Sequence, residues 1–167
     1  MLKKYRKIFI VVFVLIQCFS FNAFATNENM VLQDCNITIE EFESLEHSYA
    51  SYDTSSSRAT GLIISQSLAI AKSGNNLIIT GKTVGDENKV IKCGFETLTV
   101  ERRANSTASW SEYCSYSKLY DSDNSYTLSK SVAVDSGYQY RVTGEHRAYE
   151  GWFTYQSING TTDPIQF

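Results

Sequence analysis

The side chains that could support catalysis are few in this 167-residue sequence. Its two histidines are His47 and His146, and a catalytic base needs a neighbouring nucleophile and an orienting group. Glu145 directly precedes His146 on a predicted strand, so their side chains are expected to point to opposite faces. No nucleophile-elbow, zinc-protease or phosphate-loop pattern occurs. We therefore expect no enzyme activity and no cofactor. A small hydrolase built from carboxylates on distant loops ranks below the other functions.

Asp121, Asp123 and Asn124 bring three oxygen-bearing side chains close together in the sequence, and Ca²⁺ prefers such ligands. The twelve-residue calcium loop also needs a central glycine and a terminal glutamate, which are missing here. No C-x-x-C or Cys/His cluster of the kind that zinc requires occurs either. The stretch is predicted to be a polar loop between two strands, and no metal site is expected.

Three cysteines follow the first 25 residues: Cys35, Cys93 and Cys114. An odd number leaves three arrangements open, namely one bridge with one free thiol, a bridge between two chains, or three free thiols. Cys93 and Cys114 lie on separate predicted strands and would face each other if those strands pair. A disulfide between them needs Cα atoms ~5.5 Å apart, so it is one of the alternatives and not a firm prediction.

Aromatic side chains are the strongest indication of a binding surface. Tyrosine and tryptophan with polar neighbours make flat amphipathic platforms that stack on sugars or anchor protein contacts. The alternative is that tyrosine, with its high strand propensity, fills the edges of a sheet. The candidate ligand-binding residues are Trp110, Tyr113, Tyr116, Tyr120, Tyr126, Tyr149, Trp152 and Tyr155.

From Gly61 onward, short runs of apolar and β-branched residues are separated by turn residues, and no helical period interrupts them. We count about seven strands in residues 58–167. That number and spacing are typical of an immunoglobulin or fibronectin type III sandwich, with a small barrel such as the OB fold as the rival. The predicted fold class is thus all-β, preceded by a short N-terminal helical arm.

The stretch 134–144 is predicted to form the central strand. Tyr138 and Tyr140 alternate with polar residues, so one side of the strand is apolar. Val134, Gly137 and Tyr140 also have the spacing of a tyrosine corner, in which a tyrosine hydroxyl bonds back to the preceding crossover. These three residues are predicted to be structural and not functional.

The first 25 residues have the pattern of a secretory signal peptide. A basic segment is followed by an apolar run at 8–16 and by an A-x-A cleavage motif at 23–25. The run is shorter than the ~20 residues needed to span a bilayer, so we expect cleavage and no membrane segment afterwards. The protein is then predicted to be secreted, either free outside the cell or associated with the cell wall.

The charge of the remaining chain argues against two classes of partner. Without residues 1–25, eleven Lys and Arg face eighteen Asp and Glu, a formal charge of −7. Nucleic acid and anionic membranes attract basic surfaces, so neither is expected to bind.

Residues 26–57 are predicted to form an acidic arm, because they hold seven of the acidic residues and no Lys or Arg. Thr38 and Glu41 have the spacing of a capping box, which marks the start of a helix. The apolar residues that follow recur at helical intervals: Ile39, Phe42, Leu45 and Tyr49. This predicts an amphipathic helix of roughly three turns, followed by the Ser-rich linker 53–57.

Several short motifs of residues 58–167 resemble a family of small secreted domains from Gram-positive, clostridial-type bacteria. The motifs are 58–63, 92–95, 98–103, Trp110 and 137–146. The resemblance covers about two thirds of the chain and implies export and a β-sandwich. It implies no particular activity, because no role is assigned to the family, and the acidic arm lies outside it.

The leading functional hypothesis is a non-catalytic extracellular binding module that contacts cell-wall glycan, a host surface or another secreted protein. Its contact residues would be the exposed aromatics of the two tyrosine-rich stretches, 113–126 and 149–155. The second hypothesis is a structural or self-assembling protein, in which the arm or an unpaired cysteine joins copies of the chain.

Overall fold

The computed structural model describes residues 32–52 and 61–167, so the predicted signal peptide and linker lie outside the described residues. The described chain is almost entirely antiparallel β-structure, which confirms the all-β prediction. None of its helical residues belongs to a helix long and apolar enough to cross a membrane. The elements are β1 (Gln33–Asp34), α2 (Ile39–Glu43), β2 (Glu46–Tyr52), β3 (Ile63–Ser73), β4 (Asn76–Gly85), β5 (Lys92–Arg103), β6 (Ser111–Asp121), β7 (Ser125–Ala133), β8 (Gln139–Tyr149), β9 (Tyr155–Thr162) and β10 (Ile165–Gln166).

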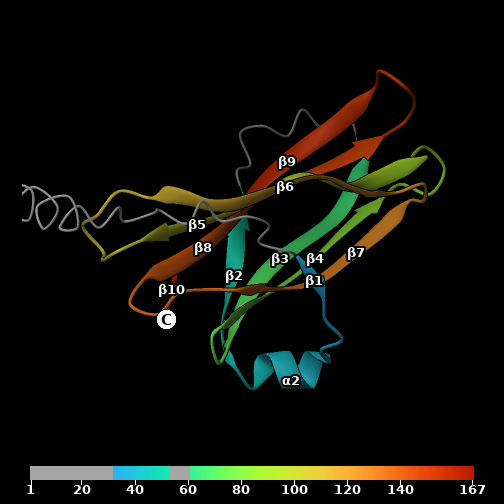
Figure 1. Cartoon of the computed structure of the whole chain (residues 1–167). Helices are drawn as coiled ribbons and strands as arrows, with labels where there is room; N and C mark the ends of the chain where they lie inside the picture. The colour runs from blue at the N-terminus through green and yellow to red at the C-terminus, as the bar shows by residue number, and fades with distance from the viewer. Residues whose placement is uncertain (1–31, 53–60) are drawn as a thin grey trace, which may run out of the picture.

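The strands form one curled sheet in the order β1-β7-β4-β3-β2-β9-β8-β5-β6, and the short β10 pairs with β8 (Figure 1). β2 joins the two halves of this sheet, because residues 46–49 pair with β3 and residues 50–52 pair with β9. About seven strands are predicted for residues 58–167; β3 to β10 lie in the described part of that range, and β1 and β2 lie before it. β3 and β4 form a hairpin within one half, and the chain crosses to the other half between β4 and β5.

Alternation along the strands buries one face of each half of the sheet. In β8, every second residue from Tyr140 to Ala148 is buried, and the residues between them are partly exposed. The buried side chains of both halves pack into a main cluster, in which Tyr140 and Phe95 are the largest. Burial of this apolar surface is the dominant favourable term in folding. It also fixes which residues of β8 face outward.

Tyr140 lies at the start of β8, and its side chain is fully buried. Its hydroxyl group donates to the carbonyl oxygen of Asp135 and accepts from the Asp135 amide, both at 3.1 Å. Gly137 has a φ of 87°, which a glycine adopts without steric cost and which lets the chain turn between Val134 and Tyr140. These residues hold the crossover from β7 to β8 in the manner that their spacing predicts.

The N-terminal helix is shorter than the sequence predicts. α2 has five residues, and the capping box between Thr38 and Glu41 is formed. Phe42 packs against β3 and β4 on the side away from the main cluster, but the chain then enters β2, on which Tyr49 lies. The prediction of three helical turns is wrong because β2 bonds to two neighbouring strands. That pairing outweighs the weak preference of a short isolated helix.

Cys35, Cys93 and Cys114 are free thiols. In the register of β5 against β6, Cys93 lies opposite Asp121, and Cys114 lies opposite Val100. Cys93 and Val100 are separated along β5 by roughly 23 Å, at about 3.3 Å per residue. A disulfide cannot bridge such a distance. The Cys93–Cys114 alternative is therefore wrong: the residues occupy neighbouring strands but not opposite positions.

Candidate functional site

Strands β9, β8, β5 and β6 present an outward face on which charged, hydroxyl and aromatic side chains gather. The pairing register sets their neighbours, since Tyr149 of β8 lies between Lys92 of β5 and Tyr155 of β9. Further along the same side of β8, Arg147 is paired with Ser157 of β9. Each of these side chains is at least partly exposed. Two of the predicted binding residues thus lie beside charged residues that the sequence analysis did not identify.

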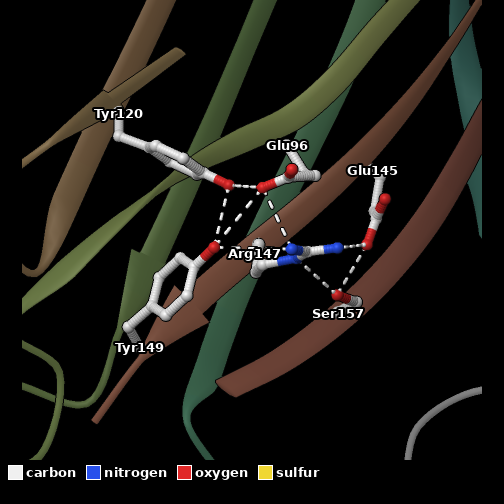
Figure 2. Close-up of polar contacts among 6 residues, drawn as sticks. All are labelled: Glu96, Tyr120, Glu145, Arg147, Tyr149 and Ser157. Carbon is white, nitrogen blue, oxygen red and sulfur yellow. Dashed lines mark hydrogen bonds and ion pairs between the residues drawn. The ribbon is translucent and has the colours of Figure 1, made fainter. Parts of the chain in front are cut away.

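Glu96 reaches this face through an irregularity in β5. The register of β5 against β8 shifts between Phe95 and Thr97, which leaves Glu96 as an extra residue. Phe95 is fully buried, whereas the Glu96 carboxylate lies among the side chains of Tyr120 and Tyr149 (Figure 2). A β-bulge often re-aims a side chain in this way.

Gly94 allows β6 to approach β5 closely beside the bulge. A Cβ atom added to Gly94 would lie 2.0 Å from the backbone oxygen of Leu119 and 2.8 Å from the Cα atom of Tyr120. Glycine is the residue that permits such a close approach of two backbones. It brings Tyr120 to the position from which its hydroxyl donates a hydrogen bond to Glu96.

Arg147 stands between two carboxylates at the centre of the site (Figure 2). Its Nη1 atom lies 3.0 Å from Glu96, and its Nη2 atom donates to Glu145. Ser157 accepts from Nε of Arg147 at 3.1 Å and donates to Glu145 at 2.8 Å. Charge-assisted bonds of this kind are stronger and more directional than neutral ones. The guanidinium and both carboxylates are therefore held in place by the protein itself.

Two tyrosine hydroxyls complete the surroundings of Glu96. Tyr120 donates one hydrogen bond to the carboxylate, and Tyr149 donates another at 3.4 Å. The bond from Tyr120, together with the nearby charge of Arg147, holds the pKa of Glu96 below its ordinary value. Burial and the bond to Glu96 raise the pKa of Tyr120. Near neutral pH, Glu96 is thus ionised and Tyr120 is neutral.

The rings around Tyr149 are held by ring–ring and cation–π contacts. The ring centroid of Tyr149 lies 5.6 Å from that of Tyr120 and 5.7 Å from that of Tyr155. The Lys92 ammonium lies 4.2 Å from the Tyr120 centroid and 5.2 Å from the Tyr149 centroid. The guanidinium carbon of Arg147 lies 4.5 Å from the centroid of Tyr155. A cation–π contact contributes roughly 0.5–1 kcal/mol at an exposed site, so together they favour one arrangement of the rings.

A cleft of about 300 Å³ opens at this end of the face. Its lining residues are Ile91, Lys92, Ser122, Tyr149, Gly151 and Trp152. Trp152 and the adjacent Phe153 belong to the β8–β9 connection, where they are 93% and 95% exposed. Ile91 and Tyr155 are also exposed large apolar residues. A contiguous exposed apolar patch commonly marks an interaction site, and small-molecule sites begin at about this volume.

Three of the predicted tyrosines are placed elsewhere. Tyr113, Tyr116 and Tyr126 are partly buried and pack against the main core cluster. Tyr113, for example, lies edge-on to Tyr140 with 5.3 Å between the ring centroids. Closeness of several tyrosines in the sequence does not show to which face of a strand each side chain points. These tyrosines therefore do not join Tyr120, with which the sequence analysis grouped them.

Trp110 lies near the opposite end of β5 and β8 from the cleft. Its ring centroid is 4.3 Å from the guanidinium carbon of Arg103 and 4.4 Å from that of Arg141. Arg141 is bonded through Nε to Glu101 at 2.7 Å. Trp110 thus covers two arginine side chains and takes no part in the cleft.

Sequence reasoning missed the charged residues of the site. Glu145 and Arg147 occupy the outward positions of β8 that lead to Tyr149, so the two-residue period of the strand is the signal that identifies them. Glu96 gives no such signal, because the bulge in β5 breaks the period where it lies.

His146 faces inward from β8, on the opposite side from Glu145. Its Nδ1 atom lies 2.8 Å from Oγ1 of Thr83. Burial lowers the pKa of His146 to about 4, so its ring is neutral at physiological pH. Asp121 ends β6, and Asp123 and Asn124 lie in the connection to β7. In the part of the chain that the structure describes, no group of three or more His, Cys, Asp or Glu side chains is arranged to hold a metal ion.

Comparisons with protein-family models, with curated proteins and with solved structures find no match to this chain. Function must therefore be inferred from the chemistry of the site. The site combines exposed aromatic rings, a cleft and a pre-formed network of hydrogen-bonding charged groups.

Proposed function

We propose that the protein is a secreted, non-catalytic module that binds glycan on the outward face of β9, β8, β5 and β6. The observation that carries this proposal is the cleft beside Tyr149, where aromatic rings adjoin fixed carboxylate, guanidinium and hydroxyl groups. A sugar ring has an apolar face that stacks on aromatic rings and a rim of hydroxyl groups that donate and accept hydrogen bonds. The cleft offers partners for both.

The two carboxylates of the site favour recognition over hydrolysis. A glycosidase needs one carboxylic acid that remains protonated near neutral pH beside a second, ionised carboxylate. The hydrogen bond from Tyr120 and the charge of Arg147 instead lower the pKa of Glu96. Glu145 is also paired with Arg147. Both groups are thus suited to accept hydrogen bonds from sugar hydroxyls.

The proposed fold and cellular location fit this role. We interpret the two halves of the curled sheet as the two layers of a β-sandwich, since their inward side chains pack into a shared core. The outer surface of such a layer can accommodate an extended ligand. A secreted protein would also meet the glycans of the cell wall or of a host surface.

Binding of the purified protein to a glycan array tests the proposal. Tyr149→Ala removes the central ring, and Tyr49→Ala is the matched control because Tyr49 is 52% exposed on β2, outside the cleft. We expect the unmodified protein and Tyr49→Ala to bind the same glycans. Tyr149→Ala should lose about thirtyfold in affinity, as expected for an aromatic residue that contributes 2 kcal/mol to binding. The absence of any bound glycan, or equal binding by Tyr149→Ala, would contradict the proposal.

A further inference from the structure

We propose that the cleft prefers glycans carrying a carboxylate or sulfate group, and that Lys92 is the residue that recognises this anionic group. This inference rests on the proposed glycan-binding function and specifies the class of glycan. It follows from the position, the partners and the surroundings of one charged side chain.

Lys92 is the charged residue among those that line the cleft. Arg147, the cation that lies beside Tyr149 and Tyr155 on this face, is paired with two carboxylates. Within residues 32–52 and 61–167, no carboxylate forms an ion pair with Lys92. Its ammonium group therefore faces the cleft with hydrogen-bond donors that no carboxylate of the described chain occupies.

Two aromatic rings hold the Lys92 ammonium in place. It lies 4.2 Å from the ring centroid of Tyr120 and 5.2 Å from that of Tyr149. Both tyrosine hydroxyls are in turn bonded to Glu96. A lysine side chain ordinarily loses considerable rotamer freedom when it binds a ligand. Because the rings already restrict Lys92, less of that freedom remains to be lost on binding.

The acidic groups near Lys92 are engaged by other residues or lie on the other side of the sheet. Glu96 and Glu145 share the guanidinium of Arg147, whose Nη1 atom lies 3.0 Å from Glu96. Asp121 is paired with the buried residue Cys93 across β5 and β6, so both lie on the inward side of the sheet. Lys92 precedes Cys93 and points to the other side. Lys92 thus directs a positive charge into the cleft although the chain as a whole is acidic.

A sugar ring stacked beside Tyr149 would present its substituents to Lys92. A neutral hydroxyl group accepts a hydrogen bond from the ammonium, whereas a carboxylate or sulfate accepts the same bond and also gains the attraction between two opposite charges. Acidic sugars are therefore expected to bind more tightly than neutral sugars that have the same ring.

The test compares methyl β-D-glucuronide with methyl β-D-glucoside, which differ at C6. Titrations of the purified protein, followed by the indole ¹H–¹⁵N signal of Trp152, give the affinity for each sugar. We expect the glucuronide to bind about fivefold more tightly, which corresponds to about 1 kcal/mol for an exposed ion pair. The preference should narrow as NaCl is added, because salt screens exposed charges.

Three variants separate the role of Lys92 from a general effect of charge. Lys92→Gln should abolish the preference for glucuronide, and Lys92→Arg should keep it. Lys82→Gln is the matched control, because Lys82 is an exposed lysine on β4, in the other half of the sheet. It should also keep the preference.

The outcomes distinguish this inference from the proposed function. Equal affinity for the two sugars, or a preference that survives in Lys92→Gln, overturns the role of Lys92 while binding of the glucoside still supports glycan recognition. If neither sugar shifts the Trp152 signal, the preference for acidic sugars is overturned. The glycan array then decides separately whether the protein binds glycan at all.

Discussion

At the scale of single residues, the hydroxyl group of Tyr140 is the most specific structural contact. It forms two hydrogen bonds with the backbone of Asp135. We expect Tyr140→Phe to lower the free energy of unfolding by about 1 kcal/mol, the net contribution of a typical buried hydrogen bond. Tyr138→Phe is the control, because the Tyr138 hydroxyl forms no hydrogen bond within the described residues. Urea denaturation measures both variants, and equal midpoints would contradict the expected role of Tyr140.

His146 makes stability depend on pH. Burial lowers its pKa in the folded protein to about 4, whereas an unfolded histidine has a pKa near 6.5. Between these values the unfolded chain binds a proton that the folded chain does not. The contribution of the neutral His146 ring to the free energy of unfolding is therefore complete above about pH 6.5. It falls by roughly 3 kcal/mol as the pH drops toward 4.

Denaturation curves between pH 4 and pH 7 test this behaviour. His146→Gln should reduce the fall in unfolding free energy across that interval, because a glutamine does not titrate. His47→Gln, which changes a partly exposed histidine on β2, should leave the fall unchanged. If the His146→Gln and unmodified proteins show the same pH dependence, the buried neutral histidine is not its cause.

At the scale of elements, the contact between β5 and β6 depends on Gly94. An added methyl group would meet the backbone of Leu119 and Tyr120, which cannot move aside as a flexible side chain would. We expect Gly94→Ala to destabilise the protein by roughly 1–3 kcal/mol, as overpacking usually does, and to weaken glycan binding by displacing Tyr120. Gly151→Ala is the control for stability, since nothing lies within 4 Å of its added Cβ; it is not compared for binding, because Gly151 lines the cleft. Urea denaturation compares the two variants, the array compares Gly94→Ala with the unmodified protein, and equal stability of the two variants would show that the strands separate easily.

Local patterns predict some of these elements and not others. The two-residue period of β8 is read directly from sequence, and the spacing of Gly137 and Tyr140 indicates the corner before it. The bulge that presents Glu96 is not predictable, because it arises from how β5 fits against β8. The strand β2 is not predictable from sequence either, since its residues also suit a helix. Only its pairing with β3 and β9 makes the segment a strand and not a helix.

At the scale of the whole molecule, local sequence patterns do not predict the order of the strands in the sheet. The order of strands depends on contacts between residues far apart in the chain, such as the pairing of β2 with β9. A single sequence gives the number and type of strands better than their neighbours. The aromatic cleft also depends on contacts between distant residues, because Ile91, Ser122 and Trp152 reach it from three separate connections.

The position of β2 also changes where the fold begins. The sequence analysis placed the start of the β-domain at residue 58, yet β2 lies before it and links the two halves of the sheet. Tyr52, at the end of β2, packs against both buried clusters and lies 5.6 Å from the His146 ring. Gly160 of β9 makes room for this tyrosine, because an added Cβ would lie 2.5 Å from Cε1 of Tyr52.

We therefore expect a chain that begins at residue 58 not to fold. It would lack β2, which pairs with both β3 and β9, and it would expose the apolar surfaces that Phe42 and Tyr52 cover. A chain that begins at Leu32 retains every described residue and is the control. Circular dichroism and urea denaturation should show cooperative unfolding for the control and none for the shorter chain. A shorter chain that unfolds cooperatively, with the same dependence on urea, would show instead that β2 is an accessory strand and that the sheet closes without it.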